Sequence, residues 1–335
     1  MSKQIYNFCA GPAMLPVEVM ERAQREFCNF QGLGASVMEL SHRGKPYMAV
    51  AEKAEADLRD LLAVPDNYKV LFMHGGGRGQ FSAVPMNLLG GANKKADYLV
   101  TGVWAQSAVD EAQKYGDIQT FQGVAKNEQG VSHLLPTPAF RADAAYVHYC
   151  PNETIDGIEM FDIPATGDVP LVADLSSTIL SRPIDVSRFG ILYAGAQKNI
   201  GPSGLAIAIV RDDLLNQARA DVPSIFDYQL TAKNDSMFNT PPTYGIYVCG
   251  LVLEWLKANG GLSAMYELNK KKAAILYDYL DSSSFFRGTV EPASRSLMNV
   301  PFFSPSKEQD AEVAASAKAA GFDNLKGHKS VGEIG

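Results

Sequence analysis

Cysteine and tryptophan are scarce in this chain of 335 residues, which has four cysteines and two tryptophans. Cys9, Cys28, Cys150 and Cys249 form neither a CxxC pair nor the regular spacing of a disulfide framework. A disulfide-stabilised scaffold is therefore not indicated. We expect reduced thiols and a cytoplasmic location, because disulfides are rare where thiols are kept reduced.

Long apolar runs and a surplus of basic residues are also missing. No window reaches the apolar length that spans a bilayer, and the first residues, MSKQIYNFCAGPAM, lack the apolar core of a signal peptide. The chain has 30 Lys and Arg against 37 Asp and Glu, a formal net charge of −7. This balance argues against nucleic acid as the main partner, although a local arginine cluster can still attract a small anion. We therefore expect neither a membrane nor a nucleic acid among the partners.

Short apolar runs alternate with amphipathic segments along most of the chain. Several runs are apolar almost throughout, as strands buried on both faces are. The alternation predicts an α/β fold with a mostly parallel sheet of the seven-stranded type and helices on both faces. Only 205–210 follows its predecessor too closely for a crossover helix, so we expect it to pair antiparallel. The expected helices are 16–30 and 47–64, and the expected strands are 69–74, 97–102, 146–150, 170–176, 190–196 and 205–210.

The pattern changes after the paired glycines of KANGG, residues 257–261. We expect a helix at 262–280, a strand at 297–304 and a helix at 308–321. This pattern suggests a smaller α+β domain. The predicted division is a large domain over 16–261 and a small domain made of 1–15 and 262–335.

A glycine-rich loop, HGGGRGQF, follows the strand 69–74 directly. Consecutive glycines let backbone N–H groups converge, the next helix presents its first amides, and Arg78 adds a bidentate cation. Gln80 stands where a Rossmann fingerprint needs its third glycine, and no GK[ST] follows. The loop therefore predicts an anion site, with a plain tight turn as the alternative.

Asp174 and Lys198 each stand at or just beyond the carboxyl end of an apolar strand, the edge where α/β sheets bind ligands. A desolvated lysine can attack a carbonyl to form a Schiff base, and a buried aspartate can pair with a positive charge. Pyridoxal phosphate needs such a lysine and an aspartate beside its ring nitrogen. With the anion loop for the phosphate, three weak signals agree on this cofactor. The alternatives are a solvated surface lysine and an aspartate that caps a loop.

Four further residues follow a predicted strand or precede a predicted helix. Trp104 follows a strand and could stack on the cofactor ring, or else lie in the core. Thr154 could donate a hydrogen bond to the phenolic oxygen of the ring. Asn239 and Thr240, in FNTPPTYG, could reach an anion or cap the next helix.

Seven motifs, in one order along nearly the whole chain, resemble the phosphoserine aminotransferase family of class V, fold-type I enzymes. They read NFCAGPAMLP, ELSHRGKPY, HGGGRGQF, CPNETIDGIE, VADLSSTILSRPIDV, YAGAQKNIGPSG and FNTPPTYGIYVCGLVLEWL. The resemblance implies a homodimeric cytoplasmic enzyme that uses pyridoxal phosphate. It would move an amino group from L-glutamate to 3-phosphohydroxypyruvate in serine biosynthesis, and in some bacteria also serve pyridoxine biosynthesis through 4-phosphohydroxy-L-threonine.

The resemblance also implies a role for each matching residue. Lys198 is the Schiff-base lysine, Asp174 pairs with the ring nitrogen, Trp104 stacks on the ring, and Thr154 meets the phenolic oxygen. The implied phosphate contacts are Gly77, Arg78 and Gln197, with Asn239 and Thr240 from the neighbouring subunit. The implied substrate contacts are His42 and Arg43, also from across the dimer, together with His328 and Lys329. Such cations suit substrates with two or three negative charges.

Three positions depart from the family pattern. Lys329 stands where the family commonly has arginine, and loses the planar fork. Ala10 replaces a serine of the N-terminal motif. After SVGEIG the family continues into a strand with another arginine and a helix, so we expect a truncated small domain with an uncovered sheet edge and apolar face. Cofactor binding should then survive better than turnover.

Two other functions stay open at this stage. One is a related class V transaminase for another amino acid, which a substrate panel would separate. The other is a protein that binds pyridoxal phosphate but is catalytically impaired. The sequence gives little support for a nucleotide-binding oxidoreductase, because it matches neither the Rossmann fingerprint nor the GK[ST] phosphate loop.

Overall fold

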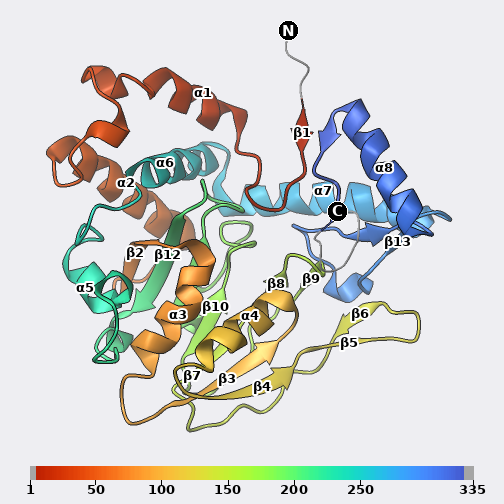
Figure 1. The fold of residues 1–335 in the computed structure, drawn as a ribbon, viewed down its shortest axis with the longest axis horizontal. Helices are drawn as coiled ribbons and strands as arrows, with labels where there is room; N and C mark the ends of the chain where they lie inside the picture. Colours follow the sequence, from red (N-terminus) through yellow and green to blue (C-terminus); the bar gives the residue numbers. More distant parts are fainter. Residues whose placement is uncertain (1–4, 328–335) are drawn as a thin grey trace.

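The central sheet of the computed structural model, which describes residues 5–327, has seven strands in the order β2-β12-β11-β10-β7-β3-β4 (Figure 1). β12 pairs antiparallel with both of its neighbours, and every other pair is parallel. The predicted fold class and the antiparallel strand are therefore confirmed. The strands are β2 (Tyr68–His74), β3 (Lys95–Val100), β4 (Asp117–Gln122), β7 (Tyr146–Tyr149), β10 (Leu171–Asp174), β11 (Ile191–Gly195) and β12 (Leu205–Arg211).

Helices cover both faces of this sheet, whose inner strands β7, β10 and β11 are buried throughout. Leu171 and Ala173 face a core shared with α1, α2 and α6, whereas Val172 faces a second core shared with α3, α4 and α5. Figure 1 shows α3 and α4 lying across the second face. The helices are α1 (Val17–Glu26), α2 (Lys45–Leu62), α3 (Gly76–Leu88), α4 (Val103–Ala112), α5 (Tyr228–Lys233), α6 (Thr243–Ala258), α7 (Gly261–Ser282) and α8 (Lys307–Ala320).

Short strand pairs stand outside the central sheet. β1 (Tyr6–Asn7) pairs with β15 (Phe322–Asp323), so the N-terminal segment joins the C-terminal region. Figure 1 shows α8 and β13 together beyond α7, on the side where β1 lies. The division into two domains stays a prediction. The other pairs are β5 (Val124–Lys126) with β6 (Ser132–Leu134), β8 (Asn152–Glu153) with β9 (Ile158–Glu159), and β13 (Arg287–Gly288) with β14 (Phe302–Phe303).

Two predicted elements differ from the structure. The helix expected at 16–30 ends at Glu26, and Gln31 beyond it has a left-handed backbone. The strand expected at 297–304 is wrong except for Phe302–Phe303. There Ser296 Oγ accepts hydrogen bonds from the N–H groups of residues 298 and 299, at 3.0 Å each, which turns the backbone away from a ladder.

No helix among residues 5–327 is both long enough and apolar enough to cross a bilayer.

Candidate active site

The carboxyl ends of β2, β7, β10 and β11 lie at one edge of the sheet, because these strands run in the same direction. Asp174 ends β10, the turn with Lys198 follows β11, and the glycine loop follows β2. Loops at this edge can bring side chains distant in sequence to one place.

Asp174 is buried at 6% exposure and uses its two oxygens differently. Oδ1 accepts hydrogen bonds from the Ser176 N–H at 2.9 Å and the Ser176 hydroxyl at 2.5 Å. That hydroxyl in turn accepts from the Gly195 N–H at 3.0 Å, which ties the end of β10 to β11. No described residue donates to Oδ2. Burial raises the pKa of the Asp174 carboxyl, and the Lys198 cation and the Ser176 hydrogen bonds oppose this rise.

Lys198 points toward the same edge. Its Nζ donates a hydrogen bond to Thr154 Oγ1 at 2.5 Å and lies 5.0 Å from the centroid of the Trp104 ring. Thr154 stands in the turn between β8 and β9. The structure thus brings the predicted lysine, threonine and tryptophan together. The alternative that Lys198 is a solvated surface side chain does not agree with these contacts.

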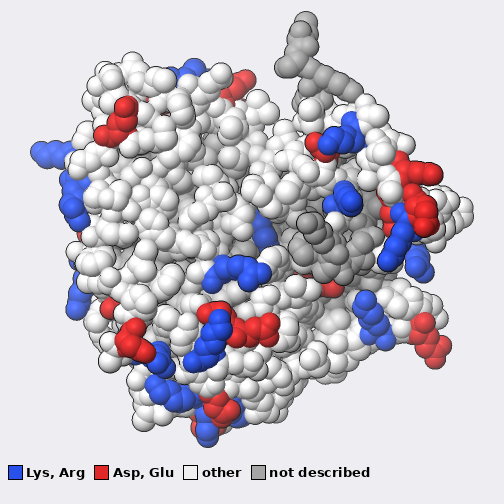
Figure 2. All heavy atoms as spheres, viewed as in Figure 1, with Lys and Arg blue, Asp and Glu red and all other residues white. Residues whose placement is uncertain are grey.

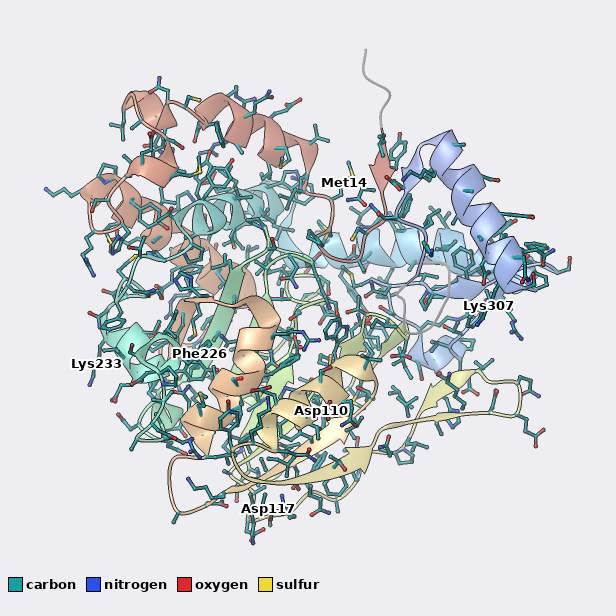
Figure 3. All side chains as sticks on the ribbon, in the orientation of Figure 1. Met14, Asp110, Asp117, Phe226, Lys233 and Lys307 are labelled. Atoms are coloured by element: carbon teal, nitrogen blue, oxygen red, sulfur yellow. The ribbon has the colours of Figure 1, made fainter. Side chains whose placement is uncertain are left out.

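The N-terminal segment covers the lysine turn, which the sequence did not indicate. The Ala13 N–H donates to the Gln197 carbonyl at 2.8 Å. A Cβ at Gly11 would lie 3.0 Å from Lys198 Cγ, so the glycine lets the chain pass close to the lysine side chain. In Figure 3, Met14 marks this segment between β1 and α1.

The glycine loop has the backbone geometry that an anion site requires. Gly75 and Gly76 have positive φ angles of 87° and 58°, and α3 begins at Gly76. A Cβ at Gly77 would lie 3.1 Å from Ser176 Oγ, and one at Gly195 only 2.8 Å from Gln197 Oε1. The loop, Ser176 and Gln197 are therefore packed together at the start of the helix.

Arg78 supplies the cation at this loop. Its Cζ lies 5.6 Å from the Trp104 ring centroid. Within residues 5–327 its guanidinium forms no ion pair. A free, partly apolar-flanked guanidinium beside helix amides suits a phosphate.

Trp104 lies in the first turn of α4, with Arg78 and Lys198 both near its ring. The Trp104 N–H donates to Glu153 Oε2 at 2.9 Å, and the Ala105 N–H donates to Glu153 Oε1 at 2.8 Å. Sequence reasoning missed Glu153. Gly102, at the start of α4, was the one signal in the sequence. A glycine has no side chain to cap a helix, so the first amides of α4 need an acceptor from elsewhere in the chain.

His42, Arg43, Asn239 and Thr240 form a second group. Arg43 Nη2 donates to the carbonyls of Met237 at 3.3 Å and Phe238 at 3.1 Å. His74 Nε2 lies 3.1 Å from the Thr240 carbonyl and 3.3 Å from Asn239 Nδ2, so this group adjoins the glycine loop.

His42 belongs to this group because it precedes Arg43 in the chain. Burial and the charge of Arg43 lower the pKa of His42. No contact within residues 5–327 joins His42 or Arg43 to Lys198 or Asp174. The alternative that Asn239 or Thr240 caps the next helix is wrong, because α6 starts after Pro242 without a side-chain cap. His328 and Lys329 lie outside the described residues.

These groups fit pyridoxal phosphate. Among the described residues, the fit rests on Asp174, whose hydrogen-bond donors all meet Oδ1, on Trp104 Nε1, which is buried without a partner, and on the glycine loop beside Arg78, which forms no ion pair. A flat ring with a protonated nitrogen and a phosphate matches an acid at one end and an anion cradle at the other.

Known proteins of similar sequence and structure point to one family. Residues 5–331 match the Aminotransferase class-V family. Phosphoserine aminotransferase from Bacillus circulans subsp. alkalophilus is 45% identical with a TM-score of 0.94, over 99% of this chain and 92% of that one. The phosphoserine aminotransferase from Trichomonas vaginalis, solved with pyridoxal phosphate bound, is 40% identical with a TM-score of 0.92, over 99% and 94%.

More distant enzymes share the fold alone. Ureidoglycine–glyoxylate aminotransferase from Bacillus subtilis is 14% identical with a TM-score of 0.78, over 100% of this chain and 88% of that one. The architecture is that of fold-type I aminotransferases. Together, the family match over residues 5–331 and the close relatives show that this chain belongs to the class-V aminotransferases, in the phosphoserine aminotransferase family.

Proposed function

We propose that this enzyme transfers the amino group of L-glutamate to 3-phosphohydroxypyruvate and forms O-phospho-L-serine and 2-oxoglutarate. The reaction is a transamination of serine biosynthesis that depends on pyridoxal phosphate. The observation that carries the proposal is the meeting of Lys198, Thr154 and Trp104 beside a buried Asp174 with one free oxygen. The two relatives above, both named phosphoserine aminotransferases, support the choice of substrates.

Each residue of the site has a distinct task. Pyridoxal phosphate, when bound, supplies an electron sink that makes the α-proton of an amino acid acidic and lets its amino group move. Asp174 Oδ2 would accept the ring N–H and keep that proton in place. Trp104 would stack on the ring, and Thr154 would hydrogen-bond its phenolic oxygen.

Lys198 is the general base. With the cofactor bound, its Nζ would take the α-proton from the substrate and deliver it to the aldehyde carbon of the cofactor, and the hydrogen bond to Thr154 Oγ1 at 2.5 Å orients this amine. Gly77, Arg78 and Gln197 would hold the cofactor phosphate with the amides at the start of α3. The N-terminal segment packs against the stem of Lys198 and limits where the side chain can lie.

The proposal includes a homodimer with shared sites. Asn239 and Thr240 would bind the phosphate, and His42 and Arg43 the substrate anion, in the site of the neighbouring subunit. His328 and Lys329 would add further cationic contacts to the substrate. Figure 2 shows that the upper middle of one face carries few charged side chains. Large apolar side chains are exposed between residues 14 and 38, among them Val17 at 53% and Leu33 at 50%, as expected of a surface that a second copy covers.

A cytoplasmic location completes the proposal. All four cysteines are free in the structure, and Cys150 and Cys249 are buried as thiols. This usage suits a reducing compartment.

A visible spectrum of the purified holoprotein, before and after L-glutamate, tests the proposal. We expect the cofactor band to shift with glutamate and to return with 3-phosphohydroxypyruvate. Unphosphorylated hydroxypyruvate should react at least about tenfold less efficiently, because it loses charge-assisted hydrogen bonds. The variant Lys198→Ala should keep its fold and lose at least about a hundredfold in turnover, the usual contribution of a positioned general base.

Two outcomes would contradict the proposal. A preference for an unphosphorylated keto acid would indicate a class V transaminase of other specificity. A cofactor band that glutamate leaves unchanged would indicate a protein that binds the cofactor without catalysis.

A further inference from the structure

Glu153 is a charged side chain at the centre of the site that the mechanism above does not use. It has 0% exposure, and it comes from the β8–β9 hairpin rather than from the helix that it contacts. Both of its oxygens accept hydrogen bonds from the first turn of α4, from the Trp104 N–H at 2.9 Å and the Ala105 N–H at 2.8 Å. A carboxylate at a helix N-terminus is favourable because the free amides and the helix dipole are positive there.

Gly102 makes room for this contact. A Cβ at position 102 would lie 2.6 Å from Glu153 Cγ and 2.7 Å from Asp156 Oδ2. The backbone of Gly102 is extended, with φ at 173°, so any residue could adopt it. The glycine is therefore required by the close approach of the carboxylate and not by its own conformation.

The two residues that Glu153 links are both placed against Lys198. The Trp104 N–H donates a hydrogen bond to Glu153, and the centroid of the Trp104 ring lies 5.0 Å from Lys198 Nζ. Thr154, the next residue in the chain, accepts the hydrogen bond of Lys198 Nζ at 2.5 Å. The hairpin is held on its other side by Asn152, whose Nδ2 donates to Ser177 Oγ and Asn299 Oδ1 at 2.9 Å each.

We propose that Glu153 is a positioning residue that, by accepting the first amides of α4, sets the Trp104 ring and the Thr154 hydroxyl at their places beside Lys198. The inference deepens the proposed function and rests on it for the catalytic roles of Trp104 and Thr154. The contact itself is independent of any cofactor.

The surroundings of Glu153 make its charge sensitive to pH. Burial raises its pKa to about 7, against the lowering effect of the two amides, and Asp156 and Asp174 raise it further. Cys150 lies within electrostatic range from the end of β7, and Lys198 lies against Thr154. From α4 the amides of Trp104 and Ala105 face it. Because both oxygens accept N–H groups, ionisation above pH 7 strengthens the contact, and protonation below it weakens the contact.

The test uses Trp104 as its own reporter. In a Trp255→Phe background Trp104 is the sole tryptophan, since the chain has two. The change is Glu153→Gln, which puts an NH₂ group against a backbone donor. We expect the emission of Trp104 in the apoprotein to shift and its quenching by acrylamide to increase. The dissociation constant of pyridoxal phosphate should rise about tenfold to a hundredfold, the effect of losing charge-assisted hydrogen bonds.

A pH titration gives a readout that a purely structural role would not move. In the apoprotein of the Trp255→Phe background, the emission of Trp104 should titrate with a midpoint near 7, and Glu153→Gln should remove this step. The matched control is Asp110→Asn, a carboxyl on the exposed side of the same helix (Figure 3), which should leave emission and affinity unchanged.

Gly102→Ala keeps the Glu153 carboxylate but pushes it away from the amides of α4. This variant therefore tests the positioning role even if Glu153→Gln does not fold. It should produce the same change in Trp104 emission and the same loss of affinity. A variant with the far-UV circular dichroism of the wild type but unchanged Trp104 emission or unchanged cofactor affinity would overturn the inference. If instead Trp104 responds while the wild-type holoenzyme shows no transamination, the proposed function fails and the positioning contact stands.

Discussion

At the scale of single residues, the buried polar groups at the sheet edge are only partly satisfied by the protein. Asp174 has Oδ1 filled by Ser176, no residue among 5–327 donates to its Oδ2, and within the same residues Trp104 Nε1 is buried without a partner. A buried polar group that is only partly paired costs free energy, so these two groups favour a bound ligand that pairs with them. The same burial that is costly to the fold makes Asp174 a suitable partner for a protonated ring nitrogen.

His148 is a second buried group with a consequence for stability. Its Nε2 contacts the Tyr193 hydroxyl at 2.8 Å, its Nδ1 is buried without a partner, and its ring stacks on Tyr98 at 4.7 Å. Burial lowers its pKa from 6.5 to about 3. Between these values the unfolded chain binds a proton that the native protein does not, so stability falls as the pH falls through this window.

We expect His148→Gln to remove that dependence while keeping a partner for Tyr193. One proton is worth about 1.4 kcal/mol per pH unit, so the variant should gain about 2 kcal/mol relative to wild type between pH 6.5 and pH 5. Urea unfolding of both apoproteins at pH 7.5, 6.5 and 5 measures this difference. If the difference in free energy of unfolding between the variant and the wild type is the same at all three pH values, His148 is not held neutral in the native protein.

At the scale of elements, the β8–β9 hairpin connects the site to the C-terminal region. Thr154 stands in its turn, and the Gly157 carbonyl accepts the Ser296 N–H at 2.9 Å. Glu159 Oε2 accepts the Leu297 N–H at 3.0 Å. Gly157 has φ at 67°, and a Cβ there would lie 2.2 Å from Pro301 Cδ. The segment after Ser294 therefore supports the hairpin that carries Thr154, in addition to the Glu153 and Asn152 contacts.

Gly157→Ala should destabilise the protein more than Gly167→Ala. Gly167 is the matched control, because its φ is 60° and nothing lies within 4 Å of an added Cβ. Both changes carry the cost of a left-handed alanine, about 1–2 kcal/mol. Gly157→Ala adds overpacking against Pro301, typically about 1–3 kcal/mol. Urea unfolding of both variants decides the matter, and equal losses would mean that the Pro301 contact yields freely.

At the scale of the whole molecule, one chain presents two groups of functional side chains. Lys198, Asp174, Thr154 and Trp104 meet at the sheet edge, whereas Arg43 is fixed by the carbonyls of Met237 and Phe238. The exposed apolar residues between 14 and 38 lie in the segment that leads to Arg43. We therefore propose that a second copy covers this surface and that each copy completes the other's site.

Hybrid dimers test the sharing of sites. Lys198→Ala and Arg43→Ala should each be nearly inactive alone. After unfolding and refolding as an equal mixture, half of the dimers are hybrids with one intact site, so about a quarter of wild-type activity should return. The control is each variant refolded separately. If native mass spectrometry shows hybrid dimers and the mixture stays inactive, Arg43 serves the site of its own chain.

Local patterns were enough to predict much of the fold and the centre of the site. Short runs that are apolar almost throughout predicted six of the strands in the central sheet, and the short turn before 205–210 predicted its antiparallel pairing. The glycine loop, Asp174 and Lys198 could be placed together because each follows a strand, and parallel strands share a carboxyl edge. The strand at 297–304 failed, since one hydroxyl, Ser296 Oγ, turned a segment that its apolar residues favoured as extended.

The sequence by itself determined the chemistry of the sheet edge, because strand ends and glycine turns are local properties that neighbouring residues set. Only the tertiary structure decided that Glu153 accepts the first amides of α4, that residues 11–13 cover Lys198, and that β1 pairs with β15. These contacts join residues distant in the chain. Their partners are chosen by packing and by the need of buried donors for acceptors, and no periodicity within one segment records that choice.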